Sequence, residues 1–173
     1  MSDPKIQRRT FVKNSTLLAA AASAFPAGVQ SQNEGSEKVR VALIGCGGRG
    51  TGAAAQALSA DDQAEIWAMA DIDQRQIDIS RETLEKNVPD AKQVKVAPER
   101  QFTGLNAYEQ VMAMNDVDVV ILTTPPGFRP FHFEAAVNAG KHVFMEKPVA
   151  VDAAGVRRVL EAARAAKAKD LKV

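Results

Sequence analysis

Residues 38–50 read Lys-Val-Arg-Val-Ala-Leu-Ile-Gly-Cys-Gly-Gly-Arg-Gly, and no other stretch of the chain is as informative. The first half begins with alternating side chains and ends as a continuous apolar run, which predicts a strand buried in a parallel sheet. The second half, residues 45–50, matches the pattern G-x-G-x-x-G and leads into an alanine-rich helical segment at 53–59. A strand, a glycine-rich turn and a helix in this order are typical of the first unit of a dinucleotide-binding domain.

The rest of the chain continues to alternate strand and helix. Strands are predicted over 64–70, 101–103, 117–123 and 142–145, and helices over 73–87, 107–114, 131–139 and 152–169. The polar stretch 88–101 is expected to hold only a brief extended piece. Gly140 is expected to end one helix and Asp152 to cap the next. Because such alternation points to crossover connections, the predicted fold class is α/β, a Rossmann-type doubly wound parallel sheet.

Composition excludes several classes of protein. Lys and Arg number 22 against 21 Asp and Glu, so the basic excess of a nucleic-acid binder is missing and no nucleic-acid partner is expected. Hydrophobic residues make up 46% and charged residues 25%, which excludes wholesale disorder. One cysteine and two histidines support neither an internal disulfide nor a Cys/His metal cluster, so no metal site is predicted.

The glycines of the turn have predicted roles at the diphosphate of a dinucleotide. Gly45 permits the tight turn, Gly47 lets the backbone approach the phosphates, and Gly50 lets the helix pack closely on the strand. The N–H groups at the start of the helix then attract the phosphates. An ordinary strand–helix turn is the alternative. Cys46 is expected to be a small packed residue, and Arg49 either touches a phosphate or stays in solvent. The candidate cofactor-binding residues are Gly45, Cys46, Gly47, Gly48, Arg49 and Gly50.

Asp71 is the predicted acidic partner of this turn. It lies 21 residues after Gly50, at the end of the second predicted strand, where a carboxylate can accept hydrogen bonds from the adenosine ribose. Its charge would repel a 2′-phosphate, so the predicted cofactor is NAD. The nearby Arg75 could hold such a phosphate, and NADP is therefore not excluded. The alternative role for Asp71 is a cap for the helix that follows.

Two further segments carry a distinctive pattern. Residues 116–125 read Asp-Val-Asp-Val-Val-Ile-Leu-Thr-Thr-Pro, and residues 139–148 read Ala-Gly-Lys-His-Val-Phe-Met-Glu-Lys-Pro. Together with the glycine turn, they resemble the N-terminal domain of the Gfo/Idh/MocA oxidoreductases, the glucose–fructose oxidoreductase and inositol dehydrogenase family. The resemblance runs from about Lys38 to the end of the chain. It implies an NAD(P)-dependent oxidoreductase that transfers a hydride to or from a sugar or polyol substrate.

The resemblance also implies roles for residues at the ends of the last two strands. Thr123, Thr124 and Pro125 would lie beside the cofactor, and Glu146 and Lys147 would lie near the nicotinamide ribose. Lys147 is the candidate catalytic residue, since a group close to the carbinol oxygen has to stabilise charge or relay a proton. A solvated surface lysine is the alternative.

The chain departs from the family after the Thr-Pro pair. Many members have an Asn-x-x-His pattern there, whereas residues 126–132 read Pro-Gly-Phe-Arg-Pro-Phe-His. Arg129 falls roughly where the family's histidine would be, and His132 is displaced by a turn. For His132, a partly buried position on a helix is favoured over a ligand contact. Pro148 is expected to follow a cis peptide bond, as it typically does in the family.

Residues 1–31 are predicted to be a twin-arginine signal peptide with the start of a linker. Residues 8–13, Arg-Arg-Thr-Phe-Val-Lys, resemble the twin-arginine consensus, and a mild apolar run at 15–24 follows them. That run is too short to span a bilayer, so no stable membrane insertion is expected. Cleavage is expected after the small residues at 22–24 or within 28–31. The predicted location is the periplasm, reached by export of the folded protein. A disordered or amphipathic N-terminal arm is the alternative.

The predicted organisation is completed by a linker at 32–37 and a dinucleotide-binding domain at 38–173, truncated at its C-terminal edge. Members of the family continue into a C-terminal α/β domain, absent here, that supplies most of the substrate pocket and usually the oligomer interface. Oligomers are therefore expected only with that domain. The alternatives for the chain are a non-catalytic dinucleotide-binding module and an inactive truncation product.

Overall fold

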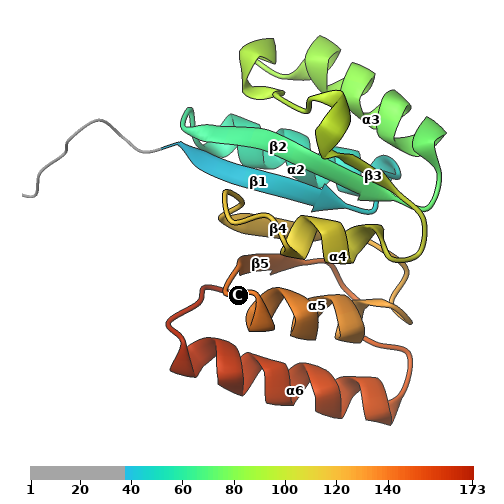
Figure 1. The fold of residues 1–173 in the computed structure, drawn as a ribbon, viewed down its shortest axis with the longest axis vertical. Helices are drawn as coiled ribbons and strands as arrows, with labels where there is room; N and C mark the ends of the chain where they lie inside the picture. The colour runs from blue at the N-terminus through green and yellow to red at the C-terminus, as the bar shows by residue number, and fades with distance from the viewer. Residues whose placement is uncertain (1–37) are drawn as a thin grey trace, which may run out of the picture. The chain divides into compact units, whose positions relative to one another are not determined.

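The computed structural model describes residues 38–173, so the predicted signal peptide and linker lie outside the described residues. The strands form one parallel sheet in the order β3-β2-β1-β4-β5, which confirms the predicted Rossmann-type fold (Figure 1). The strands are β1 (Val39–Ile44), β2 (Ala64–Asp71), β3 (Gln101–Thr103), β4 (Val119–Leu122) and β5 (His142–Met145). The helices are α2 (Gly48–Ala60), α3 (Gln74–Asn87), α4 (Ala107–Met112), α5 (Arg129–Asn138) and α6 (Ala153–Ala168).

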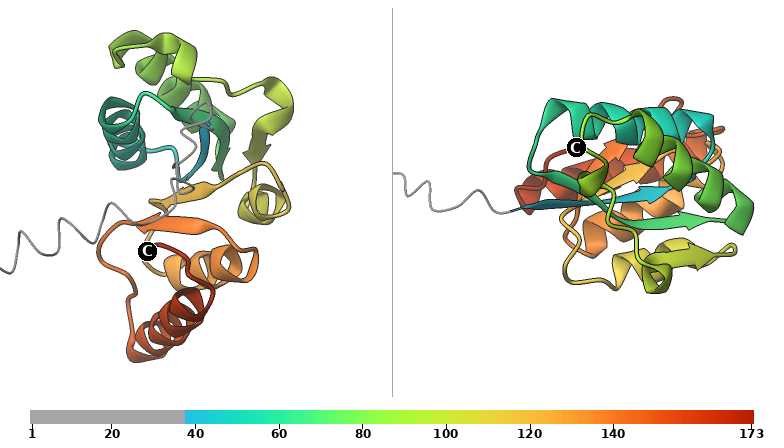
Figure 2. Two further views of the ribbon diagram at one scale, coloured as in Figure 1. Left: turned by 90° about the vertical axis from the view of Figure 1, so that its left-hand side faces the viewer. Right: turned by 90° about the horizontal axis from the view of Figure 1, so that it is seen from above.

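Helices cover both faces of the sheet, as Figure 2 shows from two directions. On one face, α2 and α3 bury side chains such as Leu58 and Ile77 against β1 and β2. On the other, α4, α5 and α6 bury side chains such as Val111 and Phe133. Because β1, β2 and β4 are covered on both sides, these strands consist of nearly continuous apolar runs. The chain passes from one face to the other after β3, so β1 lies at the centre with β2 and β4 as its neighbours.

The helix ends follow the local signals in the sequence. Asp152 caps α6, since its Oδ1 accepts a hydrogen bond from the Gly155 N–H at 2.6 Å. Gly140 follows α5 with φ +74°, a backbone conformation that favours glycine. Helix α5 starts at Arg129, two residues before the predicted start, because Pro130 fits the first turn of a helix.

The polar stretch 88–101 differs from the expected single extended piece. It contains two short 3₁₀ turns, η2 (Ala91–Gln93) and η3 (Pro98–Arg100), and one bridge between Val94 and Ile66 of β2. The Gln93 amide stabilises this arrangement, because its Nε2 donates to backbone carbonyls, including that of Ala64 at 3.0 Å. A side-chain amide thus satisfies backbone carbonyls at the end of α2 and at the start of β2.

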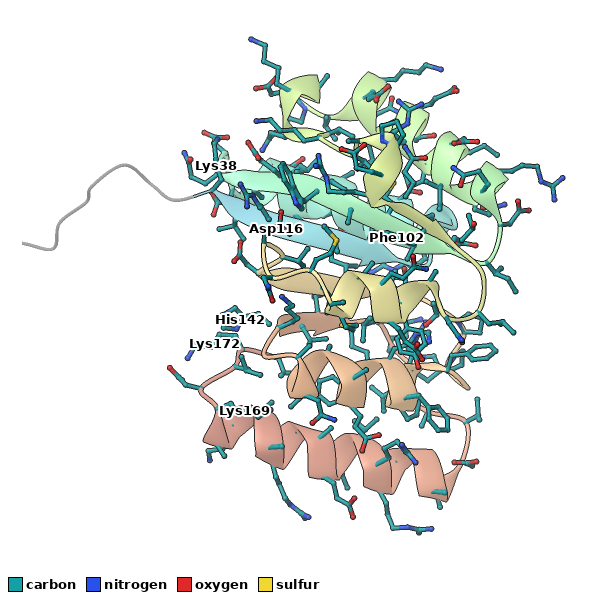
Figure 3. The ribbon with its side chains drawn as sticks, in the orientation of Figure 1. Lys38, Phe102, Asp116, His142, Lys169 and Lys172 are labelled. Carbon is teal, nitrogen blue, oxygen red and sulfur yellow. The ribbon has the colours of Figure 1, made fainter. Side chains whose placement is uncertain are left out.

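The last residues of the chain lie along the outer edge of β5. The Val143 N–H donates to the Lys172 carbonyl at 2.9 Å, and the Lys172 N–H donates to Nδ1 of His142 at 3.0 Å (Figure 3). Within residues 38–173, none of the helices combines the length and apolarity needed to cross a bilayer.

Candidate functional site: a cavity at the carboxyl ends of the central strands

A cavity of about 380 Å³ opens where β1, β2 and β4 end. In doubly wound sheets, ligands bind at the carboxyl edge of the strands, at the point where the chain switches direction along the sheet. The cavity lies at that point. Six of the predicted cofactor-binding residues line it, namely Gly45, Gly47, Asp71, Thr123, Thr124 and Pro125.

Gly45 and Gly50 are glycines because the backbone around them leaves no room for a side chain. Gly45 has φ +96°, and a Cβ atom on it would lie 2.7 Å from the Thr124 nitrogen. A Cβ atom on Gly50 would overlap the Gly45 carbonyl oxygen and lie 2.6 Å from Oγ1 of Thr123. The same Thr123 hydroxyl donates to the Gly45 carbonyl at 2.6 Å and so joins the end of β4 to the turn. The tight turn and the close helix–strand packing are therefore both present.

The start of α2 is open. Gly47 is its N-cap residue and no side chain caps the helix, which also has no acidic residue in its first turn. A Cβ atom on Gly47 or Gly48 would meet nothing within 4 Å. Free N–H groups at the start of a helix form an anion site, reinforced by the helix dipole. The turn therefore fits the diphosphate of a dinucleotide.

Asp71 faces this turn from the end of β2. Its Oδ2 accepts the Cys46 N–H at 2.6 Å, and its Oδ1 accepts the Asp73 N–H at 3.1 Å. It is not the cap of α3. That cap is Asp73, whose Oδ1 accepts the Arg75 N–H at 3.0 Å. The Asp71 carboxylate therefore lies on the cavity wall beside the glycine turn, as the ribose role requires.

Arg75, the residue that could favour NADP, already has a partner. Its Nε and Nη2 donate to Oδ2 of Asp73 at 3.0 and 2.7 Å. This bidentate pair lowers the pKa of the Asp73 carboxyl, chiefly through the side-chain hydrogen bonds. In this arrangement two of the guanidinium nitrogens are held at Asp73.

Two apolar residues at the mouth of the cavity had not been predicted from the sequence. Ile72 follows β2 and Leu105 follows β3, and their exposed fractions are 67% and 66%. Exposed aliphatic side chains of this size beside a cavity suggest that a ligand covers them. The available signal was their position, directly after Asp71 and Gly104 at the ends of adjacent strands.

The far wall of the cavity is aromatic. His132 of α5 stacks on Tyr108 of α4 with ring centroids 4.2 Å apart, and its Nδ1 lies 3.1 Å from Oγ1 of Thr124. Only 7% of His132 is exposed, and burial lowers its pKa to about 4. The expected buried position on a helix is confirmed, but His132 also lines the cavity. Tyr108 and Phe128, which also line it, had not been predicted.

The remaining predicted residues lie outside this cavity. Cys46 is buried, and burial raises the pKa of its thiol, which confirms a small packed residue. The Arg49 guanidinium pairs with the Glu146 carboxylate, an interaction that the sequence did not predict. Glu146 is only 5% exposed, and its hydrogen bond with Arg49 lowers its pKa. Lys147 is exposed, and its peptide bond with Pro148 is cis, as expected.

These features define a class of protein: a parallel doubly wound sheet with an uncapped glycine turn and a carboxylate beside it is a dinucleotide-binding Rossmann domain. Residues 39–173 match the Gfo/Idh/MocA family model, described as an oxidoreductase family with an NAD-binding Rossmann fold. The chain therefore belongs to the Gfo/Idh/MocA family and contains its NAD-binding domain.

Individual relatives agree with this assignment. The chain is 32% identical over 162 residues to a glycosyl hydrolase family 109 protein of Shewanella amazonensis, covering 83% of this chain and 34% of the relative. It is 30% identical over 124 residues to an inositol 2-dehydrogenase of Acidiphilium cryptum, covering 72% and 33%. Among solved structures, the WlbA dehydrogenase of Chromobacterium violaceum in complex with NADH and UDP-GlcNAcA is 30% identical, with a TM-score of 0.58 over 79% of this chain and 34% of that chain. The chain thus spans about a third of the length of these relatives.

Proposed function

We propose that this domain binds NAD in preference to NADP, and that the whole protein uses it to transfer a hydride to or from a sugar or polyol. The observation that carries the binding proposal is the uncapped start of α2, with open space over Gly47 and Gly48 and the Asp71 carboxylate alongside. A diphosphate at the helix start would put the adenosine ribose at Asp71. The carboxylate would accept its hydroxyl hydrogens and repel a 2′-phosphate.

The adenine would lie between Ile72 and Leu105. Both side chains are exposed and both line the mouth of the cavity next to Asp71. Covering them with a flat apolar ring removes apolar surface from water at about 25 cal/mol per Å². This placement explains why two large aliphatic residues face solvent where the strands end.

The nicotinamide half would extend toward Thr123, Thr124 and Pro125. Bound NAD supplies the hydride acceptor, and the chain's own residues orient it. Lys147 remains the candidate catalytic residue: its amine would accept the hydroxyl proton of the substrate during oxidation, and its ammonium would return that proton to the oxygen during reduction. It follows Glu146, whose carboxylate also accepts the Lys147 N–H at 3.2 Å. The names of the relatives, an inositol dehydrogenase and a dehydrogenase solved with a UDP-sugar, support a sugar or polyol substrate.

The binding proposal is tested by calorimetric titration of the 173-residue chain with NADH and NADPH. We expect NADH to bind more tightly, and Asp71→Ala to weaken NADH more than NADPH. Asp62→Ala is a matched control, since this exposed aspartate lies in the loop between α2 and β2. If Asp71→Ala lowers the affinity for both nucleotides equally, Asp71 does not bind the ribose as proposed. A folded wild-type chain that binds neither nucleotide would refute the binding proposal.

We also propose export to the periplasm by the twin-arginine route. The support is the sequence Arg-Arg-Thr-Phe-Val-Lys at 8–13 with the mild apolar run at 15–24. A route that carries folded proteins suits a domain that holds a nucleotide. The test is fractionation of cells that express the chain, with Arg8→Lys plus Arg9→Lys as the variant. We expect periplasmic protein that is lost in the variant, and export unaffected by the double change would refute the route.

A further inference from the structure

Arg129 is a buried arginine that bonds to the ends of two different strands. Its exposed fraction is 6%, and its Nε donates to the Thr124 carbonyl at 2.6 Å, just after β4. Its Nη1 donates to the carbonyls of Glu146 and Pro148 at 2.7 and 2.6 Å, just after β5. Residues 123–125 and 146–148 are therefore connected through one side chain.

A structural role in the core alone would not require a guanidinium here. Burying a cation is costly unless its donors are satisfied, and this one uses them on backbone carbonyls. The planar guanidinium presents its donors in fixed directions, so it can bond to two loops at once, whereas a lysine ammonium cannot match that geometry. Burial lowers the pKa of Arg129, and the nearby Glu146 carboxylate opposes that shift.

Glu146 is held from two sides. Its carboxylate pairs with Arg49 of the glycine turn, and its carbonyl accepts from Arg129. The glycine turn and the two loops after β4 and β5 are thus linked by two arginines. Arg129 itself does not line the cavity, so it acts through the residues that it holds.

We propose that Arg129 is a positioning residue that fixes Thr124, Glu146 and Lys147 at the nicotinamide end of the site. This inference rests on the proposed function. It predicts that substitution of Arg129 lowers the affinity for a ligand only when the ligand contains the nicotinamide half of the dinucleotide. Removing the guanidinium weakens binding of ligands that carry the nicotinamide and its ribose, and spares ligands that end at the diphosphate.

The test is titration of the full 173-residue chain with NADH and with ADP, which lacks both the nicotinamide and its ribose. We expect Arg129→Met to weaken NADH binding by ~10-fold, equivalent to about 1.4 kcal/mol, and to change ADP binding by less than ~2-fold. Arg157→Met is the matched control, because Arg157 is an exposed arginine on α6. It should leave both affinities unchanged.

If Arg129→Met weakens the binding of both ligands equally, Arg129 has a purely structural role and the proposal is overturned. Unchanged binding of both ligands would also overturn it. If Arg129→Met does not fold, Arg129→Lys decides, because it keeps the charge and removes the two-loop geometry. It should show the same selective loss for NADH, and equal loss for both ligands would overturn the proposal. If the wild-type chain binds neither ligand, the proposed cofactor site itself fails, which is a different result.

Discussion

Two glycines in α2 are expected to respond in opposite directions to the same substitution. Gly50→Ala places a methyl group against the Gly45 carbonyl and 2.6 Å from Oγ1 of Thr123, about 1 Å inside an ordinary contact. Gly52→Ala, two residues along the same helix, meets nothing within 4 Å. A comparison of the two variants separates the effect of helix propensity from the effect of close packing at the turn.

The expected changes in the free energy of unfolding follow from these contacts. Replacing a helical glycine by alanine where space is open stabilises a protein by about 0.4–1 kcal/mol. Overpacking against backbone that cannot move costs about 1–3 kcal/mol. We therefore expect Gly52→Ala to raise the free energy of unfolding and Gly50→Ala to lower it, with the two variants about 1.4–4 kcal/mol apart.

Urea unfolding followed by tryptophan fluorescence measures this difference. Trp67 is the single tryptophan of the chain, and the guanidinium groups of Arg40 and Arg100 each lie over its ring, so its emission should change on unfolding. NADH titration of both variants adds a functional measurement, in which only Gly50→Ala should weaken binding. If Gly50→Ala is as stable as Gly52→Ala, the close contact between helix and turn is not what requires a glycine.

Three further predictions concern other parts of the site. Asp73→Asn should raise the affinity for NADPH. The asparagine keeps the cap of α3 but releases the Arg75 guanidinium, which can then bind a 2′-phosphate. Unchanged NADPH binding in calorimetry would contradict this prediction. Burial lowers the His132 pKa from 6.5 to about 4. The neutral buried imidazole therefore contributes fully to the free energy of unfolding above pH 6.5. That contribution is lost as the pH falls toward 4, by up to ~1.4 kcal/mol per pH unit. Urea unfolding of His132→Phe should show a shallower fall over this range, and an identical slope would rule the histidine out as its source. The Cys46 thiol, buried and with a raised pKa, should react with iodoacetamide only after unfolding, and rapid labelling of the folded chain would contradict its placement.

The fold was predictable because its signals are local. The apolar runs of β1 and β4, the glycine at 140 and the aspartate at 152 each act on neighbouring residues. Such signals set where an element begins and ends, and alternation of strand and helix then leaves few topologies. The stretch 88–101 was less predictable, because its shape depends on the Gln93 side chain reaching carbonyls at the end of α2 and in β2.

The site was predictable only in part. The glycine turn and Asp71 follow from spacing, since one crossover unit fixes their distance. The Arg49–Glu146 pair joins residues 97 positions apart, and the stacking of Tyr108 on His132 joins two helices. No sequence spacing encodes such contacts, which arise when the carboxyl ends of several strands meet at one edge.

The most direct test of the central claim is a crystal structure of the chain with NADH. We predict the diphosphate over the N–H groups of Gly47 and Gly48, the adenosine ribose on the Asp71 carboxylate, and the adenine between Ile72 and Leu105. A diphosphate bound elsewhere, or a ribose whose hydroxyls do not reach Asp71, would contradict it.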